Sequence, residues 1–232
     1  MNKTSWIIFI VVVVVLLGGL VAWARISNPS IDVSGIENNS VITASTQNGD
    51  IADHTKGSSD NKILLIEYGD FQCPSCAAAN PNVLGLMEEY GDSVTLIFRN
   101  FPLTSIHPNA KTAAAVAESA GLQGKYWEMH NNLYDLQNEW SSLSATERTG
   151  QFQKYAEALG LDMDQFNSDL SSANVNQKIS FDMAIGKEAG VSATPTFYLN
   201  GEKLDDTVSS GIVQGDLTDI KEMLDALIAA EN

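Results

Sequence analysis

The sequence predicts an α/β fold in which a long helical block is inserted between the strands of a small sheet. Residues 63–68 form a short, nearly continuous apolar run, which is typical of a central strand buried on both faces. A second apolar strand pattern follows at 94–98, and residues of about 107–190 then show helical spacing with little strand character. Residues 196–199 form another apolar strand, and Asn200-Gly201 after it is a strong hairpin signal. This order of elements indicates an α/β fold with an insertion.

Helices are expected between and after these strands. Residues 76–90 carry a helical apolar pattern between the first two strands, although Pro81 lies inside it and should kink the helix. A final helix is expected over about residues 217–230. Inside the inserted block, helical periodicity predicts helices at 110–120, 126–136, 147–159, 163–170 and 175–189.

The N-terminal segment carries a long uncharged run over residues 6–24, bracketed by Trp6 and Trp23. At ~1.5 Å per residue, such a helix spans about 28 Å, close to the ~30 Å thickness of the bilayer hydrocarbon. Residues 1–25 are therefore predicted to be a transmembrane anchor. A cleaved signal peptide remains the alternative, because the sequence over residues 22–24 fits a small-x-small cleavage pattern. Both interpretations place the rest of the chain outside the cytoplasm.

A polar stretch over residues 26–61 separates this segment from the predicted domain. It is rich in Ser, Asn, Asp, Thr and Gly and shows no sustained helix or strand period, so it is interpreted as a tether. The domain is then expected to cover residues 62–232, with the helical insertion at about 104–190.

The amino-acid composition limits the kinds of molecule that the protein can bind. The formal net charge of −16 argues against a nucleic-acid partner, since phosphate binding needs a basic face. A hydrophobic content of 44% is compatible with a packed core. A separate dimerisation segment is not visible, which favours a monomer. His54, His107 and His130 are widely spaced and make no metal-binding pattern, so neither a metal nor another cofactor is expected.

The candidate chemistry centres on the chain's two cysteines, which form the motif Cys73-Pro74-Ser75-Cys76 after the first strand. A C-x-x-C pair at a strand–helix junction is typical of thiol–disulfide exchange. A helix N-terminus would favour the Cys73 thiolate, and Pro74 suits the first helical turn. The alternative is an inert pair or a partial metal site. A structural zinc site would need four ligands, which the chain's cysteines cannot supply.

Glu67 is a third candidate, because a carboxylate inside an apolar central strand is costly to bury in its charged form. Six residues before Cys73, it could lie beneath the pair and take the proton from Cys76 during exchange. The alternative is a strand-end carboxylate that reaches solvent or pairs with a lysine.

Three stretches of the chain resemble those of a known family. The stretches 66–76, Arg99-Asn100-Phe101-Pro102-Leu103 with His107, and 191–197 are similar to those of DsbA-like thiol–disulfide oxidoreductases of the thioredoxin superfamily, of the membrane-tethered bacterial type. The resemblance covers about residue 53 to the C-terminus. It implies a thioredoxin fold whose helical insertion caps one side of the core and helps to form a substrate groove.

The resemblance also assigns roles to individual residues. Without it, Thr194-Pro195 would be read as an ordinary trans turn; the resemblance implies a cis peptide bond beside the cysteine pair. Related proteins carry an acid at the position of Glu67. Three further residues are expected to line the substrate groove, although packing explains the first of them equally well: Phe71, Pro74 and Ser75. The implied partners are exported proteins with free thiols and a quinone-linked membrane protein that reoxidises the pair.

Three functions remain open at the level of sequence. The favoured one is an extracytoplasmic oxidase that forms disulfides through Cys73 and Cys76. A reductase or isomerase is the second, because related oxidases often carry a histidine where this chain has Ser75, and the reduction potential decides the direction. A non-enzymatic, membrane-tethered binding or chaperone domain that keeps the cysteines as a plain disulfide is the third.

Overall fold

A computed structural model describes residues 3–27, 31–58 and 60–231 of the chain. The chain divides into two units, residues 1–32 and residues 33–232. In the first unit, α1 (Lys3–Ser27) is a continuous helix. Among the residues that the structure describes, none of the helices combines the length and the apolar composition of a membrane span. The predicted anchor over 1–25 begins with residues 1–2, which lie outside the described residues.

The second unit is built on a mixed β-sheet. Strands β2 and β3 are parallel, and every other neighbouring pair in the order β1-β3-β2-β4-β5 is antiparallel. Their register places Glu67 of β2 beside Phe98 of β3 and Phe197 of β4, in the middle of the sheet. The strands are β1 (His54–Lys56), β2 (Ile63–Gly69), β3 (Val94–Asn100), β4 (Thr196–Leu199) and β5 (Glu202–Lys203).

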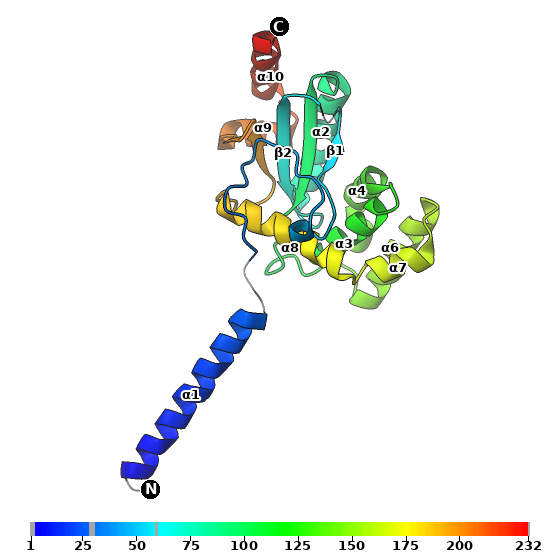
Figure 1. The fold of residues 1–232 in the computed structure, drawn as a ribbon. Coiled ribbons are helices and arrows are strands. Elements are labelled where there is room, and N and C mark those ends of the chain that lie inside the picture. The colour runs from blue at the N-terminus through cyan, green and yellow to red at the C-terminus, as the bar shows by residue number, and fades with distance from the viewer. Residues whose placement is uncertain (1–2, 28–30, 59, 232) are drawn as a thin grey trace. The chain divides into compact units, whose positions relative to one another are not determined.

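Helices α3 to α8 form the insertion between β3 and β4, as the sequence predicts. In Figure 1, α4, α6 and α7 lie to one side of the sheet, and α9 lies toward the other. The expected thioredoxin-like α/β fold with a helical insertion is thus confirmed. The helices are α2 (Pro74–Tyr90), α3 (Ala110–Gly121), α4 (Tyr126–Asp135), α5 (Gln137–Trp140), α6 (Ala145–Ala158), α7 (Met163–Asp169), α8 (Ala173–Glu188), α9 (Asp206–Gln214) and α10 (Thr218–Glu231).

The turn and the helix that follow β4 show how local sequence forms this end of the fold. Asn200 and Gly201 both have positive φ, 48° and 90°, which is the conformation that an Asn-Gly hairpin turn requires. Asp205 then caps α9 by accepting hydrogen bonds from the backbone amides of Thr207 and Val208. Helix α9 was not predicted, although the Asp205 cap is its local signal.

Two apolar clusters hold the elements together. One fills the space between α2, α9 and α10 and the sheet face that carries Ile63, Leu65, Phe197 and Leu199. The other joins the insertion to the region of the cysteine pair and includes Phe71, Phe98, Cys73 and Cys76. Because both cysteines belong to the second cluster, the helical insertion forms part of their immediate surroundings.

The predicted tether over residues 26–61 is corrected by the structure. Residues from 33 onward belong to the same unit as the domain, and β1 adds residues 54–56 to the sheet edge beside β3. Asp53 is buried and forms ion pairs with Arg99 at 2.8 Å and Lys178 at 3.0 Å. The polar side chains in this segment, which suggested a solvated linker, instead satisfy buried cations on the sheet and on α8.

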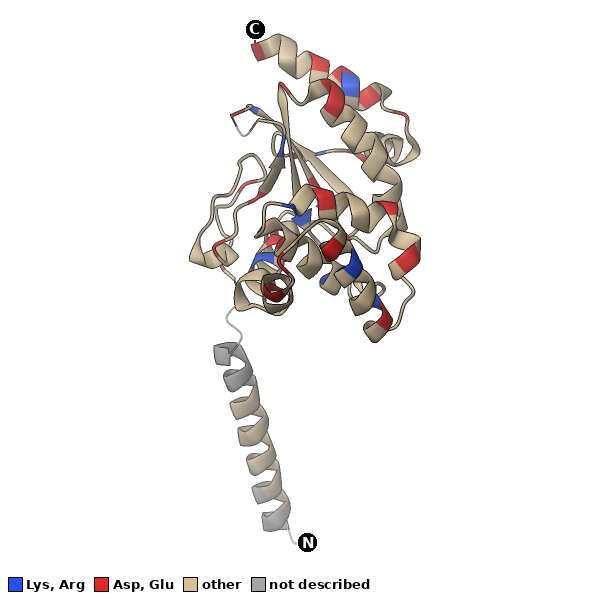
Figure 2. Ribbon diagram, turned by 90° about the vertical axis from the view of Figure 1, so that its right-hand side faces the viewer, with Lys and Arg blue, Asp and Glu red and all other residues tan. Residues whose placement is uncertain are grey.

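Acidic residues are distributed along most helices of the folded unit, and Lys and Arg are fewer, as Figure 2 shows. The two buried cations Arg99 and Lys178 are neutralised inside the fold. This arrangement fits the formal net charge of −16 and gives the unit an acidic exterior.

Candidate active site

Cys73 occupies the N-cap of α2, with Pro74 as the first helical residue. Its backbone amide donates to the Asp70 carbonyl at 2.9 Å, which closes a turn between β2 and α2. The pKa of Cys73 is lowered to about 5. The main cause is a hydrogen bond from the Cys76 thiol, and hydrogen bonds from the backbone amides of Cys76 and Ser75 act in the same direction, against the effect of burial. Cys73 is therefore a thiolate at neutral pH in the dithiol form.

Cys76 lies one helical turn further along α2, and both cysteines are free thiols in the structure. Cys76 is fully buried, whereas Cys73 keeps 7% exposure. Burial raises the pKa of Cys76 well above its ordinary value, and the hydrogen bond to Cys73 and the charge of Glu67 raise it further. The two thiols thus differ in exposure and in pKa, as thiol–disulfide exchange requires. Cys73 is the nucleophile near the surface, and Cys76 is the buried, protonated partner.

The peptide bond between Thr194 and Pro195 is cis, as the family resemblance implied. It lies in the loop before β4, and β4 pairs with β2 in the centre of the sheet. The Cys73 sulfur lies 3.3 Å from the Thr194 carbonyl oxygen. The loop before β4 and the start of α2 therefore meet at the reactive sulfur.

Glu67 is almost completely buried, at 3% exposure, and its Oε1 atom has no hydrogen-bond partner among the described residues. Burial raises its pKa to about 8, and the negative charge of Cys73 contributes to the increase. The alternative of a solvent-exposed or lysine-paired carboxylate does not hold, since none of the described salt bridges includes Glu67. A buried acid that titrates near neutrality beside a thiol can exchange a proton with it.

Two polar residues that sequence reasoning missed hold the loop before Cys73. Asp70, which is buried, accepts hydrogen bonds from the backbone amides of Gln72 and Leu103, each at 2.8 Å, and its other contact is His107 at 2.8 Å. The Gln137 side chain donates to the carbonyl oxygens of Phe71 and Cys73, at 2.8 and 3.0 Å. Asp70 could have been found from the sequence, because it lies three residues before Cys73. Gln137 lies 64 residues from Cys73, and no nearby sequence pattern indicates that it supports the motif.

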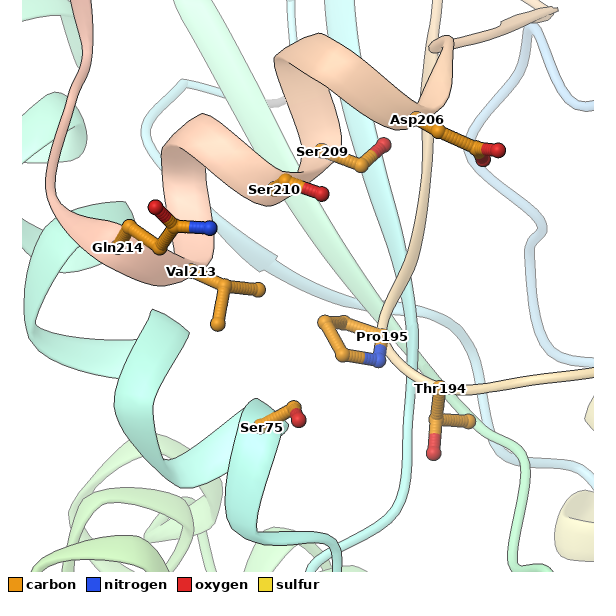
Figure 3. Close-up of a pocket in the computed structure, with 8 residues that line it drawn as sticks. All are labelled: Ser75, Thr194, Pro195, Asp206, Ser209, Ser210, Val213 and Gln214. Atoms are coloured by element: carbon orange, nitrogen blue, oxygen red, sulfur yellow. The ribbon is translucent and has the colours of Figure 1, made fainter.

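A pocket of about 420 Å³ adjoins the cysteine motif. Figure 3 shows Ser75 at the start of α2 and the Thr194-Pro195 loop on one side of it, with the α9 side chains on the other. Its α9 lining is mainly polar and consists of Asp206, Ser209, Ser210, Val213 and Gln214.

The residues that were expected to line a substrate groove differ in their exposure. Ser75 is exposed and lines the pocket, and Pro74 beside it is also exposed. The expectation for Phe71 is wrong, because its side chain is 1% exposed and packs against Phe98 and Tyr134 in the core. An aromatic residue just before the cysteine motif therefore anchors the motif instead of contacting a substrate.

The fold and the two free cysteines beside a cis-proline loop define a thioredoxin-type protein with a paired-thiol site. The thioredoxin family model matches residues 50–216. The chain belongs to the thioredoxin family.

Solved structures agree with this assignment at the level of the fold. Wolbachia pipientis alpha-DsbA1 is 23% identical, with a TM-score of 0.63 over 77% of this chain and 92% of that one. MdbA from Corynebacterium diphtheriae, a thiol-disulfide oxidoreductase, is 18% identical, with a TM-score of 0.58 over 81% of this chain and 98% of that one. The thioredoxin family and the fold that the resemblance implied are thus confirmed, whereas the membrane-tethered type stays a prediction.

A longer curated protein also contains a related segment. The Na(+)/H(+) antiporter NhaA 1 of Mycolicibacterium vanbaalenii is 37% identical over 153 residues, which is 64% of this chain and 23% of that protein. The chain spans less than a quarter of the length of this relative. The antiporter name belongs to the whole of that longer protein.

Proposed function

We propose that this chain is an extracytoplasmic thiol–disulfide oxidoreductase that forms disulfides in exported proteins through Cys73 and Cys76. The observation that carries the proposal is the contrast between the two sulfurs. The pKa of Cys73 is lowered to about 5 at the edge of the protein, whereas burial raises the pKa of Cys76 well above its ordinary value. A stabilised Cys73 thiolate favours the reduced pair, and a pair whose reduced form is stabilised is a strong oxidant.

The reaction starts from the Cys73–Cys76 disulfide. A substrate thiolate attacks the Cys73 sulfur, the bond between Cys73 and Cys76 breaks, and Cys76 leaves as a thiolate that takes a proton from Glu67. A second substrate thiolate then attacks the substrate sulfur of the mixed disulfide. The substrate disulfide forms, and Cys73 leaves as the thiolate that its surroundings stabilise. Two substrate thiols are oxidised and the enzyme disulfide is reduced.

The pocket beside Ser75 and Pro195 supports a polypeptide substrate. It is an open volume of about 420 Å³ next to the exposed end of the cysteine motif, so a chain that carries the attacking cysteine could extend across it. Its polar lining offers hydrogen-bond partners for a segment that is not yet folded. Regeneration of the disulfide would need a membrane redox partner that passes electrons to a quinone.

The location outside the cytoplasm is part of the same proposal. Residues 6–24 are uncharged and strongly apolar, which supports export or anchoring of the chain. A pair that forms disulfides is useful in an oxidising compartment.

Trapping of reaction intermediates tests the proposed activity. In a Cys76→Ala variant of the full chain mixed with a disulfide-bonded peptide, the Cys73 thiolate attacks one peptide sulfur, the peptide disulfide breaks and the other peptide sulfur leaves as a thiolate. The mixed disulfide at Cys73 is expected to accumulate, because the Cys76 thiol that would resolve it is absent. A Cys73→Ala variant is the matched control and should trap no substrate. Absence of thiol-linked adducts on Cys73 in the first variant would contradict the activity and would favour a binding domain.

A further inference from the structure

The pocket beside the cysteine motif has one charged side chain among the described residues that line it, Asp206 at the start of α9. Asp206 is exposed, and it takes part in none of the ion pairs within the described part of the chain. The neighbouring Asp205, in contrast, uses its carboxylate to cap the helix. The Asp206 carboxylate is therefore available to a charged group that enters the pocket.

The pocket follows α9 away from the redox site. The C-terminal end of α9 is fixed to α2, because the Asn82 side chain donates to the Ile212 carbonyl oxygen at 2.8 Å. In Figure 3, Val213 lies at the end of α9 nearer Ser75, and Asp206 lies at the opposite end. The helix rises about 10 Å between Val213 and Asp206, at ~1.5 Å per residue. Asp206 thus marks the end of the pocket that lies away from the cysteine motif.

This length sets which part of a substrate would meet Asp206. An extended polypeptide advances ~3.3 Å per residue, so about three residues cover ~10 Å. A substrate cysteine that reacts with Cys73 beside Ser75 would therefore place a side chain about three positions away opposite Asp206. The hydroxyls of Ser209 and Ser210, which also line the pocket, can form hydrogen bonds with the residues between.

The electrostatics at this end of the pocket favour a cation. The N-terminus of a helix carries about half a positive charge, and Asp205 already accepts hydrogen bonds from its first amides. The full negative charge of Asp206 is added to that capped end. The nearest basic residue in the sequence, Lys203, lies on β5 and does not line the pocket. A lysine or arginine side chain would therefore be attracted here, and an acidic one would be repelled.

We propose that Asp206 selects substrate segments that carry a lysine or arginine about three residues from the reacting cysteine. The inference rests on the proposed exchange activity and names the class of polypeptide that the site prefers. The formal net charge of −16 would attract any cationic peptide. A contact at Asp206 makes a different demand, because the attraction then depends on where the basic residue stands in the peptide.

Peptides with a single cysteine and blocked termini test this dependence on the full chain. Each carries Lys, Gln or Glu three residues from the cysteine, on its N-terminal or C-terminal side, or Lys seven residues from it. In excess peptide, one thiolate attacks Cys73 and forms the mixed disulfide, and Cys76 leaves. A second peptide thiolate then releases the peptide disulfide and the reduced protein. Acid quenching followed by thiol alkylation gives the rate at which the Cys73–Cys76 disulfide is lost.

Each rate is divided by the rate of the same peptide with oxidised glutathione, because a nearby lysine also increases the thiolate fraction of the peptide. On the side of the cysteine that extends along α9, Lys at the third position should react about 3-fold faster than Gln, the effect of an exposed ion pair. It should react about 10-fold faster than Glu. Lys at the third position on the other side, or at the seventh position, should give a smaller gain.

Variants of Asp206 test the residue itself. Asp206→Asn should bring the ratio of the Lys to the Gln peptide close to one, and Asp206→Lys should reverse the order of the Lys and Glu peptides. Asp164→Asn is the matched control, because Asp164 is also an exposed acid in the first turn of a helix, α7, and does not line the pocket. It removes the same charge from the chain and should keep the wild-type ratio.

The outcomes separate this inference from the proposed function. If the peptides reduce the disulfide and Cys73 is trapped in Cys76→Ala, but the third and seventh positions give equal gains, the attraction comes from the overall charge and the role of Asp206 is refuted. Equal ratios in Asp206→Asn, Asp164→Asn and the wild type would refute it as well. If none of the peptides reduces the disulfide and Cys73 traps nothing, the exchange activity itself fails, and this inference fails with it.

Discussion

The sulfur of Cys73 lies 3.3 Å from the carbonyl oxygen of Thr194, a residue 121 positions further along the chain. The contact exists because β4, which follows the Thr194-Pro195 loop, pairs with β2, which leads into the Cys73 turn. The helical insertion separates the two segments in the sequence without separating them in space. The reactive sulfur is therefore positioned by the central pairing of the sheet, and an exchanging substrate would meet both segments at once.

The first prediction concerns the protonation of Cys73 in the reduced protein. Its alkylation rate should be almost constant from pH 8 down to about 6 and should fall below about pH 5, since its pKa is about 5, against ~8.5 for an ordinary cysteine. Thiolate absorbance and the iodoacetamide reaction rate measure this profile. Cys76→Ala should move the profile to higher pH, because the Cys76 hydrogen bond is the largest cause of the lowered pKa. An unchanged midpoint in that variant would contradict this assignment.

The second prediction concerns Glu67 and stability. Its pKa in the folded protein is about 8, above the ordinary value of 4.5, so the folded state holds this proton more tightly than the unfolded state does. Its contribution is therefore fully present below about pH 4.5 and is lost as pH rises through about 8. Relative to the wild type, Glu67→Gln should gain a few kcal/mol in the free energy of unfolding between these limits, at ~1.4 kcal/mol per pKa unit.

Urea unfolding of the reduced proteins at a series of pH values measures this difference. Glu222→Gln is a suitable control, because Glu222 is an exposed carboxylate on α10. A stability difference between Glu67→Gln and the wild type that does not change with pH would show that Glu67 titrates normally.

The third prediction separates a buried ion pair from an exposed one. Lys178 is fully buried and pairs with Asp53 and Asp182 at 3.0 and 2.8 Å. Lys178→Met should lower the free energy of unfolding by ~3–5 kcal/mol, because it leaves buried carboxylates undercompensated. Lys221 pairs with Glu89 on the surface, and Lys221→Met should cost no more than ~1 kcal/mol. Equal losses for the two variants would contradict the burial of the Lys178 cluster.

The fourth prediction concerns the support of the Cys73 loop. Gln137→Ala removes the donors to the Phe71 and Cys73 carbonyl oxygens and should destabilise the protein by ~1–3 kcal/mol, the cost of leaving buried acceptors unsatisfied. Exchange should also slow, since the reactive sulfur loses its anchor. Gln151→Ala is the control, because that side chain donates to Glu139 at the surface. Wild-type exchange and stability in Gln137→Ala would show that the loop holds its position without this support.

Much of the fold could be predicted from short-range sequence patterns. The apolar run at 63–68, the Asn200-Gly201 turn and the 3.6-residue period of the insertion each depend on neighbouring residues, and the structure contains all of them. The start of α2 at Cys73 could also be predicted from neighbouring residues, because an apolar strand precedes the motif and Pro74 favours the first helical turn. Glu67 was noticeable because a single carboxylate interrupts an apolar strand.

The remaining features depend on contacts between distant parts of the chain. Residues 33–61 look like a linker because their partners, Arg99 and Lys178, lie far away in the sequence. Phe71 was expected in the groove, but its contacts with Phe98 and Tyr134 could only be known once α4 was placed. Sequence positions alone could not show that the Gln137 side chain would donate to the backbone carbonyl oxygen of Cys73, 64 residues away.

The reduction potential of the Cys73–Cys76 pair tests the central claim most directly. Equilibration of the full chain with a series of glutathione redox buffers, followed by thiol trapping, gives this value. The proposed oxidase role predicts a potential above about −180 mV, since the stabilised Cys73 thiolate favours the reduced form. A value near or below about −270 mV, as in thioredoxin, would contradict the oxidase role and would assign the site to disulfide reduction.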